Sequence, residues 1–440
     1  MQPRPGIGKP RQTGGRADVT GMNDADTSAL SNEELRAVEV LRHPETIRQR
    51  CEQLFARAEQ GRSEHFTLHL ERLPDIIDRV REAMRARYRR MEIPHHSRWS
   101  HFRAGNVERL TELDGQLRGA AAHERGRALY DLVITSVLLD AGAGDHWTYE
   151  EAQTGLRLGR SEGLAVASLR MFQNGIFSSR PGEALRADAA ALEATTPESL
   201  APPLQVSDAN PLVALAGRSR LLQQLGRNVR RRSEFQRHGE SRPGHLFDYF
   251  VEHARGGKLP APVMLRVVLR ALGDIWPGRV NIGGVNLGDV WYHSAVCGEG
   301  LGAQLVPFHK MSQWLTYSLV EPLEQAGIRV TAMDELTGLA EYRNGGLFLD
   351  SGVIVPRDPL VMARRYAPDH EVVVEWRALT VGLLDRVAAR VREAVGADAE
   401  TLPLTKVLEG GTWQAGRDLA RRRRPAGGAP IQIDSDGTVF

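Results

Sequence analysis

Residues 306–358 read VPFHKMSQWLTYSLVEPLEQAGIRVTAMDELTGLAEYRNGGLFLDSGVIVPRD, and they place polar side chains within apolar helical patterns. Lys310 is one of only four lysines, at positions 9, 258, 310 and 406, among 57 basic residues. Since arginine fills nearly every other basic position, a lysine inside an apolar helix indicates a need for a compact ammonium that can lose its proton. This stretch therefore predicts two helices and a candidate site on them.

Helical periodicity recurs along most of the chain, so we expect a mostly α-helical fold. Ser31 and Glu34 form a capping box that opens a helix ending at Leu41. Pro74 stands at the start of a helix that runs to about residue 90. No glycine fingerprint follows a strand, which argues against a dinucleotide-binding fold or a P-loop. Further helical patterns cover residues 44–60, 122–140, 161–175, 210–227, 262–276, 308–326, 335–349, 371–395 and 411–423, and short strands are expected at 280–282, 285–287, 352–355 and 431–433.

Composition is that of an ordinary globular protein, with 41% hydrophobic and 25% charged residues and a net charge of +2. This balance gives no general attraction to nucleic acid or to an acidic membrane surface. Residues 1–27 are rich in Gly, Pro and Arg, and we expect a disordered tail there. Residues 28–440 are expected to form a single large helical domain, with 238–245 as a surface loop.

The two cysteines, Cys51 and Cys297, lie far apart, and neither stands at zinc-ligand spacing from a histidine. Structural zinc and a disulfide scaffold are therefore not expected. The sequence has no apolar run long enough to span a membrane and no apolar leader segment near its start. We expect a cytoplasmic protein without a metal ion or cofactor.

Lys310, Gln313 and Trp314 share one face of the helix predicted at 308–326, because they are three and four residues apart. Such an edge suits a binding pocket, with the indole as a wall and the polar groups as orienting donors. A half-exposed helix whose lysine reaches solvent explains the pattern equally well.

Glu341 is predicted to lie in the middle of an apolar helix, followed by Tyr342, Arg343 and Asn344. Its carboxylate either pairs with Arg343 or faces a cavity, and only the second arrangement suits catalysis. The Asn-Gly-Gly run at 344–346 is expected to end this helix, and backbone amides in such a turn can bind phosphate.

Weaker candidates lie in four other segments. His96, Arg98 and Trp99 in PHHSRWSHF suit a stacking and hydrogen-bonding wall for a small polar ring, or alternatively a loop anchored in the core. The basic run at 227–237 contains a single aromatic residue, Phe235, rather than an interleaved series, and is read as a solvated helix face rather than a nucleic-acid site. Asp140 and Arg160 with Glu162 stand at helix ends, where they either line a pocket or act as caps, and Asp289 and Trp291 follow a glycine-rich hairpin.

Several of these motifs together resemble the uracil-catabolism family of fungi and bacteria. They are HSRWSHF, LLDAGAG, GRSEGLAVASLRMF, NIGGVNLGDVW, LVPFHKMSQWLTYSL, LTGLAEYRNGGLFLDSGV, KVLEGGTW and SDGTVF, and the resemblance spans roughly residues 35–440. It implies a role in a pyrimidine-degradation route in which uracil becomes a nucleotide, the ring is opened and urea is released. A ribosylurea species is an intermediate of that route, and association with the other enzymes of the route is an expected property.

The order FHKxxQ, LTGLAEYR and SGVI is also similar to the queuosine-nucleotide N-glycosylase family, which is related to helix-hairpin-helix DNA glycosylases. The resemblance implies a DNA-glycosylase-like core. In that family the match to Glu341 is a catalytic aspartate, and the match to Lys310 lies on a neighbouring helix. Here a glutamate replaces the aspartate, and NGG replaces the Val-Pro that follows the arginine.

The resemblance implies an N-glycosidase that cleaves a ribose C–N bond of a ribosylurea-type nucleoside or nucleotide. Glu341 is then the carboxylate that stabilises positive charge at C1′, and Asp140, Asp289 or His96 assists the leaving nitrogen. A 5′-phosphate would bind Lys310, Arg343 or the glycine amides. Three alternatives stay open: a hydrolase of the ring-opened uracil nucleotide, a non-enzymatic scaffold of the pathway, and a nucleic-acid glycosylase, which the charge balance disfavours.

Overall fold

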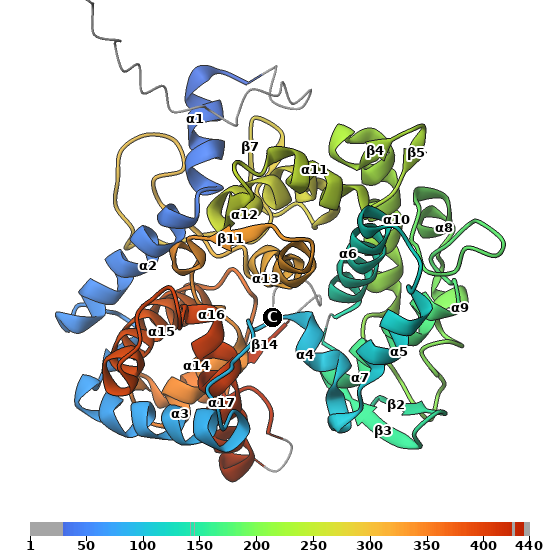
Figure 1. Cartoon of the computed structure of the whole chain (residues 1–440). Helices are drawn as coiled ribbons and strands as arrows, with labels where there is room; N and C mark the ends of the chain where they lie inside the picture. The colour runs from blue at the N-terminus through green and yellow to red at the C-terminus, as the bar shows by residue number, and fades with distance from the viewer. Residues whose placement is uncertain (1–29, 141, 145, 425–426, 435–440) are drawn as a thin grey trace, which may run out of the picture.

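A computed structural model describes residues 30–140, 142–144, 146–424 and 427–434 (Figure 1). The tail predicted at 1–27 lies outside these ranges. The described chain is mostly helical, as expected. Its helices are α1 (Asn32–Leu41), α2 (Pro44–Glu59), α3 (Leu73–Arg87), α4 (Arg98–Phe102), α5 (Arg109–Gln116), α6 (Ala122–Leu139), α7 (Arg160–Gln173), α8 (Ala189–Glu193), α9 (Pro197–Leu200), α10 (Leu215–Arg231), α11 (His245–His253), α12 (Ala261–Ala271), α13 (Lys310–Gln325), α14 (Tyr342–Asp350), α15 (Glu371–Val395), α16 (Leu404–Val407) and α17 (Trp413–Arg423).

Helix α13 lies near the centre of the view, between two groups of helices (Figure 1). On one side α15 packs against α2, α3, α14 and α16, and on the other side α6 packs against α7, α10 and α11. Helix α13 contacts α4, α6 and α12. A continuous hydrophobic core joins both groups, from Phe55 on α2 to Ile431 near the end of the described chain. Burial of these apolar faces, more than helix propensity, holds the helices in place.

The strands are short and form two-stranded pairs. Five pairs are antiparallel: β1 (Phe66–Leu68) with β12 (Ile354–Pro356), β2 (Thr148–Glu151) with β3 (Leu156–Gly159), β4 (Gln236–Arg237) with β5 (Glu240–Ser241), β7 (Asn281–Ile282) with β8 (Val285–Asn286), and β9 (Val290–Tyr292) with β10 (Leu305–Pro307). Two are parallel: β6 (Lys258–Pro260) with β11 (Arg329–Thr331), and β13 (Arg365–Tyr366) with β14 (Gln432–Ile433). The parallel pairs tie together segments that are distant in the sequence.

Most predicted helices are confirmed to within a few residues, including the capping box in which the Ser31 side chain accepts from the Glu34 backbone. Several predictions were wrong in part. The helix predicted at 210–227 begins later and ends later, as α10. The pattern at 262–276 ends at Ala271, because a short 3₁₀ turn begins at Gly273. The surface loop predicted at 238–245 contains β5 and the start of α11.

The helix predicted at 335–349 was wrong at its start, because α14 begins only at Tyr342. The segment before it stays non-helical, and Gly338 lies so close to the Leu384 side chain that a Cβ would not fit. Gly345 and Gly346 do not end the helix but lie within it. A Cβ on Gly345 would fall 2.8 Å from the Trp376 ring, so close packing against α15 explains this glycine.

Replacing Gly416 by Ala is expected to destabilise the protein by about 1–3 kcal/mol. Gly416 on α17 packs against α14, and an added Cβ would collide with the Arg343 backbone carbonyl. Gly115→Ala on α5 is the matched control, because that Cβ has no atom within 4 Å. Urea unfolding of both variants gives the comparison, and equal stability of Gly416→Ala and the parent protein would contradict the close packing.

Candidate active site at converging helix ends

Glu341 is the N-cap of α14, where an extended segment turns into the helix. Its two carboxylate oxygens accept hydrogen bonds from the backbone N–H groups of Arg343 and Asn344, both at 2.7 Å. Burial raises the pKa of the Glu341 carboxyl above its ordinary value, against the opposing effect of these N–H groups and of Lys310. The residue is half-buried.

Lys310 is the first residue of α13, and its backbone N–H donates to the Asp289 carboxylate at 3.0 Å. Its Nζ lies 3.5 Å from Met311 Sδ and forms no ion pair with the residues that the structure describes. Burial lowers the pKa of the Lys310 ammonium, and the nearby Glu341 carboxylate is the strongest influence in the opposite direction. A half-buried ammonium near a carboxylate, without a direct bond between them, leaves both groups free to contact a ligand.

Other charged side chains stand at neighbouring helix ends. The pKa values of Lys310 and Tyr342 are each influenced by both Glu341 and Asp140, which places all four groups near one another. We call the group of polar side chains at these helix ends the helix-end cluster; its members are Arg98, Asp140, Arg160, Glu162, Lys310, Glu341 and Tyr342. Each member except Arg98 is partly exposed to solvent.

Arg98 and Asp140 form a buried ion pair within the helix-end cluster, with 3.0 Å between Nη1 and Oδ2. The Arg98 guanidinium is fixed further by a hydrogen bond to Ser136 Oγ at 2.7 Å, whereas its Nη2 has no hydrogen-bond partner among the described residues. Asp140 follows the last residue of α6, so the pair joins α4 to the end of α6. An ion pair held this firmly can present one polar edge to a ligand without moving.

The start of α7 supplies Arg160 and Glu162. Arg160 has a φ of +53°, in the left-handed region that residues with a side chain rarely adopt. Such strain is concentrated at functional sites, because the surrounding packing has to maintain it. Glu162 forms an ion pair with Arg417 on α17. The N-termini of α7, α13 and α14 all meet at the cluster, and their helix dipoles favour an electron-rich ligand there.

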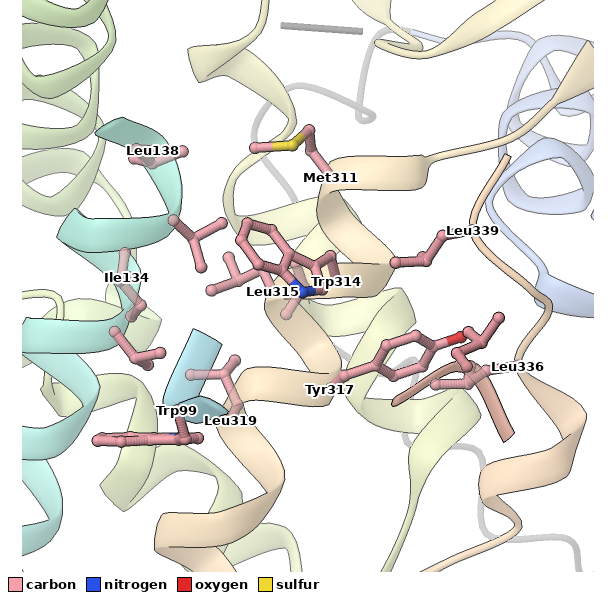
Figure 2. Packing of buried hydrophobic residues seen from close by; sticks show 14 of the residues in the cluster. Trp99, Ile134, Leu138, Met311, Trp314, Leu315, Tyr317, Leu319, Leu336 and Leu339 are labelled. Atoms are coloured by element: carbon pink, nitrogen blue, oxygen red, sulfur yellow. The ribbon is translucent and has the colours of Figure 1, made fainter. Parts of the chain in front are cut away.

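Aromatic rings border the helix-end cluster. Trp314 lies between α6 residues Ile134 and Leu138 on one side and Leu339 on the other (Figure 2). The Arg98 guanidinium stands 5.5 Å from the Trp314 ring centroid, and the His101 ring is 5.7 Å away. The Trp314 indole N–H is buried and has no hydrogen-bond partner in the part of the chain that the structure describes. Aromatic surface next to unused donors is typical of sites for planar polar ligands.

Asp289 is held by its neighbours and is a positioning residue. Arg377 donates to both of its oxygens at 2.7 and 2.8 Å, and the Trp291 indole N–H donates at 2.6 Å. Together with the Lys310 backbone N–H, these contacts hold the pKa of the Asp289 carboxyl well below its ordinary value. These contacts tie the Asp289 carboxylate to the start of α13.

The remaining predicted residues make contacts within the fold. The Gln313 amide donates to Thr337 Oγ1 at 2.9 Å and joins α13 to the segment before α14. Trp99 is 3% exposed and packs in the core. Arg343 Nη1 donates to the Gly427 carbonyl, and Asn344 donates to the Leu339 carbonyl. The Gly345 N–H bonds within α14, to Glu341 O, so the predicted phosphate turn at 344–346 is not formed.

Some site residues gave no recognisable signal in the sequence. His101 lies in the HSRWSHF motif, and Trp413 follows the LEGG motif, but nothing in their local pattern separates them from core aromatics. Their rings are 6.1 Å apart at the border of the cluster. Arg417 contacts Glu162, which is 255 residues away in the sequence, and Arg377 contacts Asp289, which is 88 residues away. No local spacing predicts contacts of this range.

Burial of the Glu321 carboxyl on α13 can be tested by measuring the stability of the protein at two pH values. Ser97 Oγ donates to its carboxyl at 3.0 Å, and burial raises the pKa of Glu321 to about 7 from an ordinary 4.5. The folded state therefore binds this proton more tightly than the unfolded chain, and the resulting stability is lost as the pH rises through about 7. We expect Glu321→Gln to raise the free energy of unfolding by about 1–3 kcal/mol near pH 8 and to change it little near pH 4.

The matched control for this test is Glu59→Gln, an exposed change at the end of α2. The Glu59→Gln protein should show no increase in the free energy of unfolding that differs between the two pH values. Urea unfolding of both variants at the two pH values makes the comparison. An equal gain from Glu321→Gln at both values would contradict the burial of an ionisable carboxyl at this position.

Across the described ranges, no helix is long and apolar enough to cross a membrane. Nor does any group of three or more His, Cys, Asp or Glu side chains in these ranges have a geometry that could hold a metal ion.

Comparison with known proteins decides the family. Residues 40–440 match the model described as Protein of unknown function (DUF1688). The chain belongs to the DUF1688 family. The DUF1688 protein is 39% identical over 403 residues to Protein urg3 of Schizosaccharomyces pombe, covering 90% of this chain and 96% of that protein. It is 38% identical over 430 residues to Uracil catabolism protein 4 of Lachancea kluyveri, covering 90% of this chain and 97% of that protein. The resemblance to the uracil-catabolism family is confirmed.

Proposed function

We propose that this DUF1688 protein takes part in uracil catabolism as an N-glycosidase, which hydrolyses the ribose C–N bond of a ribosylurea-type compound and releases urea. The pathway assignment rests on a relative named Uracil catabolism protein 4, which matches nearly its whole length. The reaction type rests on the chemistry of the helix-end cluster.

The observation that carries the proposal is a fixed Glu341 carboxylate with the Lys310 ammonium near it but not bonded to it. Cleavage of a ribose C–N bond passes through a state with positive charge at C1′, and a fixed carboxylate stabilises that charge or activates the attacking water. The two backbone N–H groups at the start of α14 fix the Glu341 carboxylate in position. Desolvation strengthens its interaction with a developing cation, because the surrounding dielectric is lower than that of water.

Other members of the cluster suit the two ends of such a substrate. The Lys310 ammonium, free of an ion pair, suits a sugar hydroxyl, a phosphate or the urea carbonyl. The Trp314 ring and the Arg98–Asp140 pair offer a flat surface with one donor edge and one acceptor edge. Urea requires both kinds of partner, since it has N–H donors and a carbonyl acceptor.

The test is to incubate purified protein with ribosylurea and, separately, with its 5′-phosphate, and to follow products by mass spectrometry. We expect free urea together with ribose or ribose phosphate in equal amounts. Ammonia or an acyl fragment from the ring-opened uracil nucleotide would instead support the amide hydrolase. No turnover of any of these compounds, combined with binding to another protein of the pathway, would support the scaffold.

A further inference from the structure

A second pair of titratable side chains, His96 and Glu409, lies beside the helix-end cluster. His96 Nδ1 is 2.9 Å from Glu409 Oε2, and the two side chains are only 6% and 5% exposed. The sequence suggested His96 as one of three candidates for assisting the leaving group. It gave no reason to connect His96 with Glu409, which is 313 residues away.

The surroundings of Glu409 hold it ionised and in place. Its Oε1 accepts hydrogen bonds from the Tyr88 hydroxyl at 2.9 Å and from Arg87 Nη2 at 3.2 Å. Although burial opposes ionisation, the bond to His96 and the charge of Arg87 keep the pKa of the Glu409 carboxyl below its ordinary value. A fixed, ionised carboxylate on Nδ1 sets the imidazole orientation and leaves Nε2 as the atom that exchanges a proton.

The backbone around Glu409 is unusual. Residues Leu408–Thr412 form a short π-helix between α16 and α17. Such π-turns occur frequently at functional sites, because they shift the side chains that they carry. Gly411 has no room for a Cβ beside Val80, so this turn packs directly on α3, the helix that ends at Arg87 and has Tyr88 as its C-cap. The π-turn thus brings Glu409 to its partners.

The pair lies beside residues that border the helix-end cluster. Burial is the main cause that lowers the pKa of His101, and this ring is close enough to Arg98, Asp140 and Glu162 of the cluster, and to His96, for these groups to influence it as well. The His96 ring centroid lies 6.3 Å from that of Trp413. One residue before this tryptophan, Thr412 Oγ1 donates to the Asn344 side chain at the start of α14. Across the described residues, His96 Nε2 has no hydrogen-bond partner.

We propose that His96 is the proton donor to the leaving nitrogen and that Glu409 is the positioning residue that orients it. The inference rests on the proposed N-glycosidase function. As the C1′–N bond breaks, its electron pair goes to the urea nitrogen, which takes the proton from His96 Nε2. Water adds to C1′ and gives its proton to Glu341. Proton exchange with solvent then restores both groups, so ribosylurea and water yield ribose and urea.

The inference is tested with two leaving groups. Urea is a poor leaving group and requires protonation, whereas 4-nitrophenolate leaves without it. With ribosylurea as substrate, His96→Asn should lower kcat by about 10²–10⁴-fold, the usual contribution of a general acid. With 4-nitrophenyl riboside the same variant should change kcat by less than about 5-fold. Glu341→Gln should reduce the rate with both substrates, because it acts on C1′ rather than on the leaving group.

His95→Asn is the matched control. His95 is a buried neighbour bonded to Thr405 Oγ1 at 2.7 Å, outside the proposed pair, and its replacement should leave both rates unchanged. Glu409→Gln gives a separate readout, because Glu409 is proposed to act through His96 and not on the substrate. It should lower kcat with ribosylurea at an unchanged KM and change kcat with 4-nitrophenyl riboside by less than about 5-fold.

The outcomes separate the two proposals. Equal losses with both substrates in His96→Asn, or no loss with either, would overturn the role of His96 and leave the N-glycosidase function standing. Equal losses of kcat with both substrates in Glu409→Gln, or a change in KM alone, would overturn the positioning role of that residue. A parent protein that releases no urea from ribosylurea would overturn both the function and this inference.

Discussion

Glu341→Gln should lower the rate of urea release from ribosylurea by about 10³-fold or more, because it removes the fixed negative charge that opposes the positive charge at C1′. The neutral amide retains one oxygen for the N-cap of α14, so loss of the second bond should cost only about 1 kcal/mol of stability. Initial rates of urea release, measured beside a thermal melt, separate the loss of activity from any loss of fold.

Asp188→Asn is the matched control for this change. Asp188 is the N-cap of α8, and its two oxygens accept from the backbone N–H groups of Ala191 and Ser179, as those of Glu341 do at α14. Its replacement should cost similar stability and leave urea release unchanged. Comparable losses of activity in the two variants would mean that Glu341 acts only as a helix cap.

Asp289→Ala should destabilise the protein by about 3–5 kcal/mol, because it leaves the Arg377 guanidinium buried without its counter-charge. Arg377 is fully buried, and both N–H arms of its fork bind Asp289. The variant also frees the start of α13, so Lys310 loses its fixed position and any remaining activity should fall. Urea unfolding followed by circular dichroism measures the loss of stability.

The comparison for Asp289 is an exposed ion pair. Arg157 and Glu150 on the β2–β3 hairpin are 74% and 57% exposed, and Glu150→Ala should change stability by about 0–1 kcal/mol. If Asp289→Ala cost no more than Glu150→Ala, the assignment of Asp289 as the residue that fixes the start of α13 would be wrong.

Helix positions followed from local sequence, because burial of one face imposes a 3.6-residue period that the chain displays. The capping box at Ser31 and the 25-residue helix α15 are predictable on this ground. The start of α14 was not predictable, since the apolar pattern continues through residues 336–341 although the backbone there is not helical. Contacts with α13 and α15 override the local preference, as the bond between Thr337 and Gln313 illustrates.

Candidate residues were recognised individually, but their partners were not. Lys310 and Glu341 stood out by residue type, and the structure places them together. Asp289 also stood out, but its partner Arg377 lies 88 residues later in an unremarkable helical pattern. The ion pair between Glu162 and Arg417 spans 255 residues. Contacts between residues so far apart in the sequence depend on how the helices pack, and no local sequence pattern predicts them.

The most direct test of the N-glycosidase proposal is the amount of free urea formed from ribosylurea by the purified DUF1688 protein. The proposal predicts that urea and ribose appear in equal amounts with the parent protein, and that the Glu341→Gln protein forms neither at a comparable rate. Intact ribosylurea after prolonged incubation with the parent protein, or ammonia in place of urea, would contradict it.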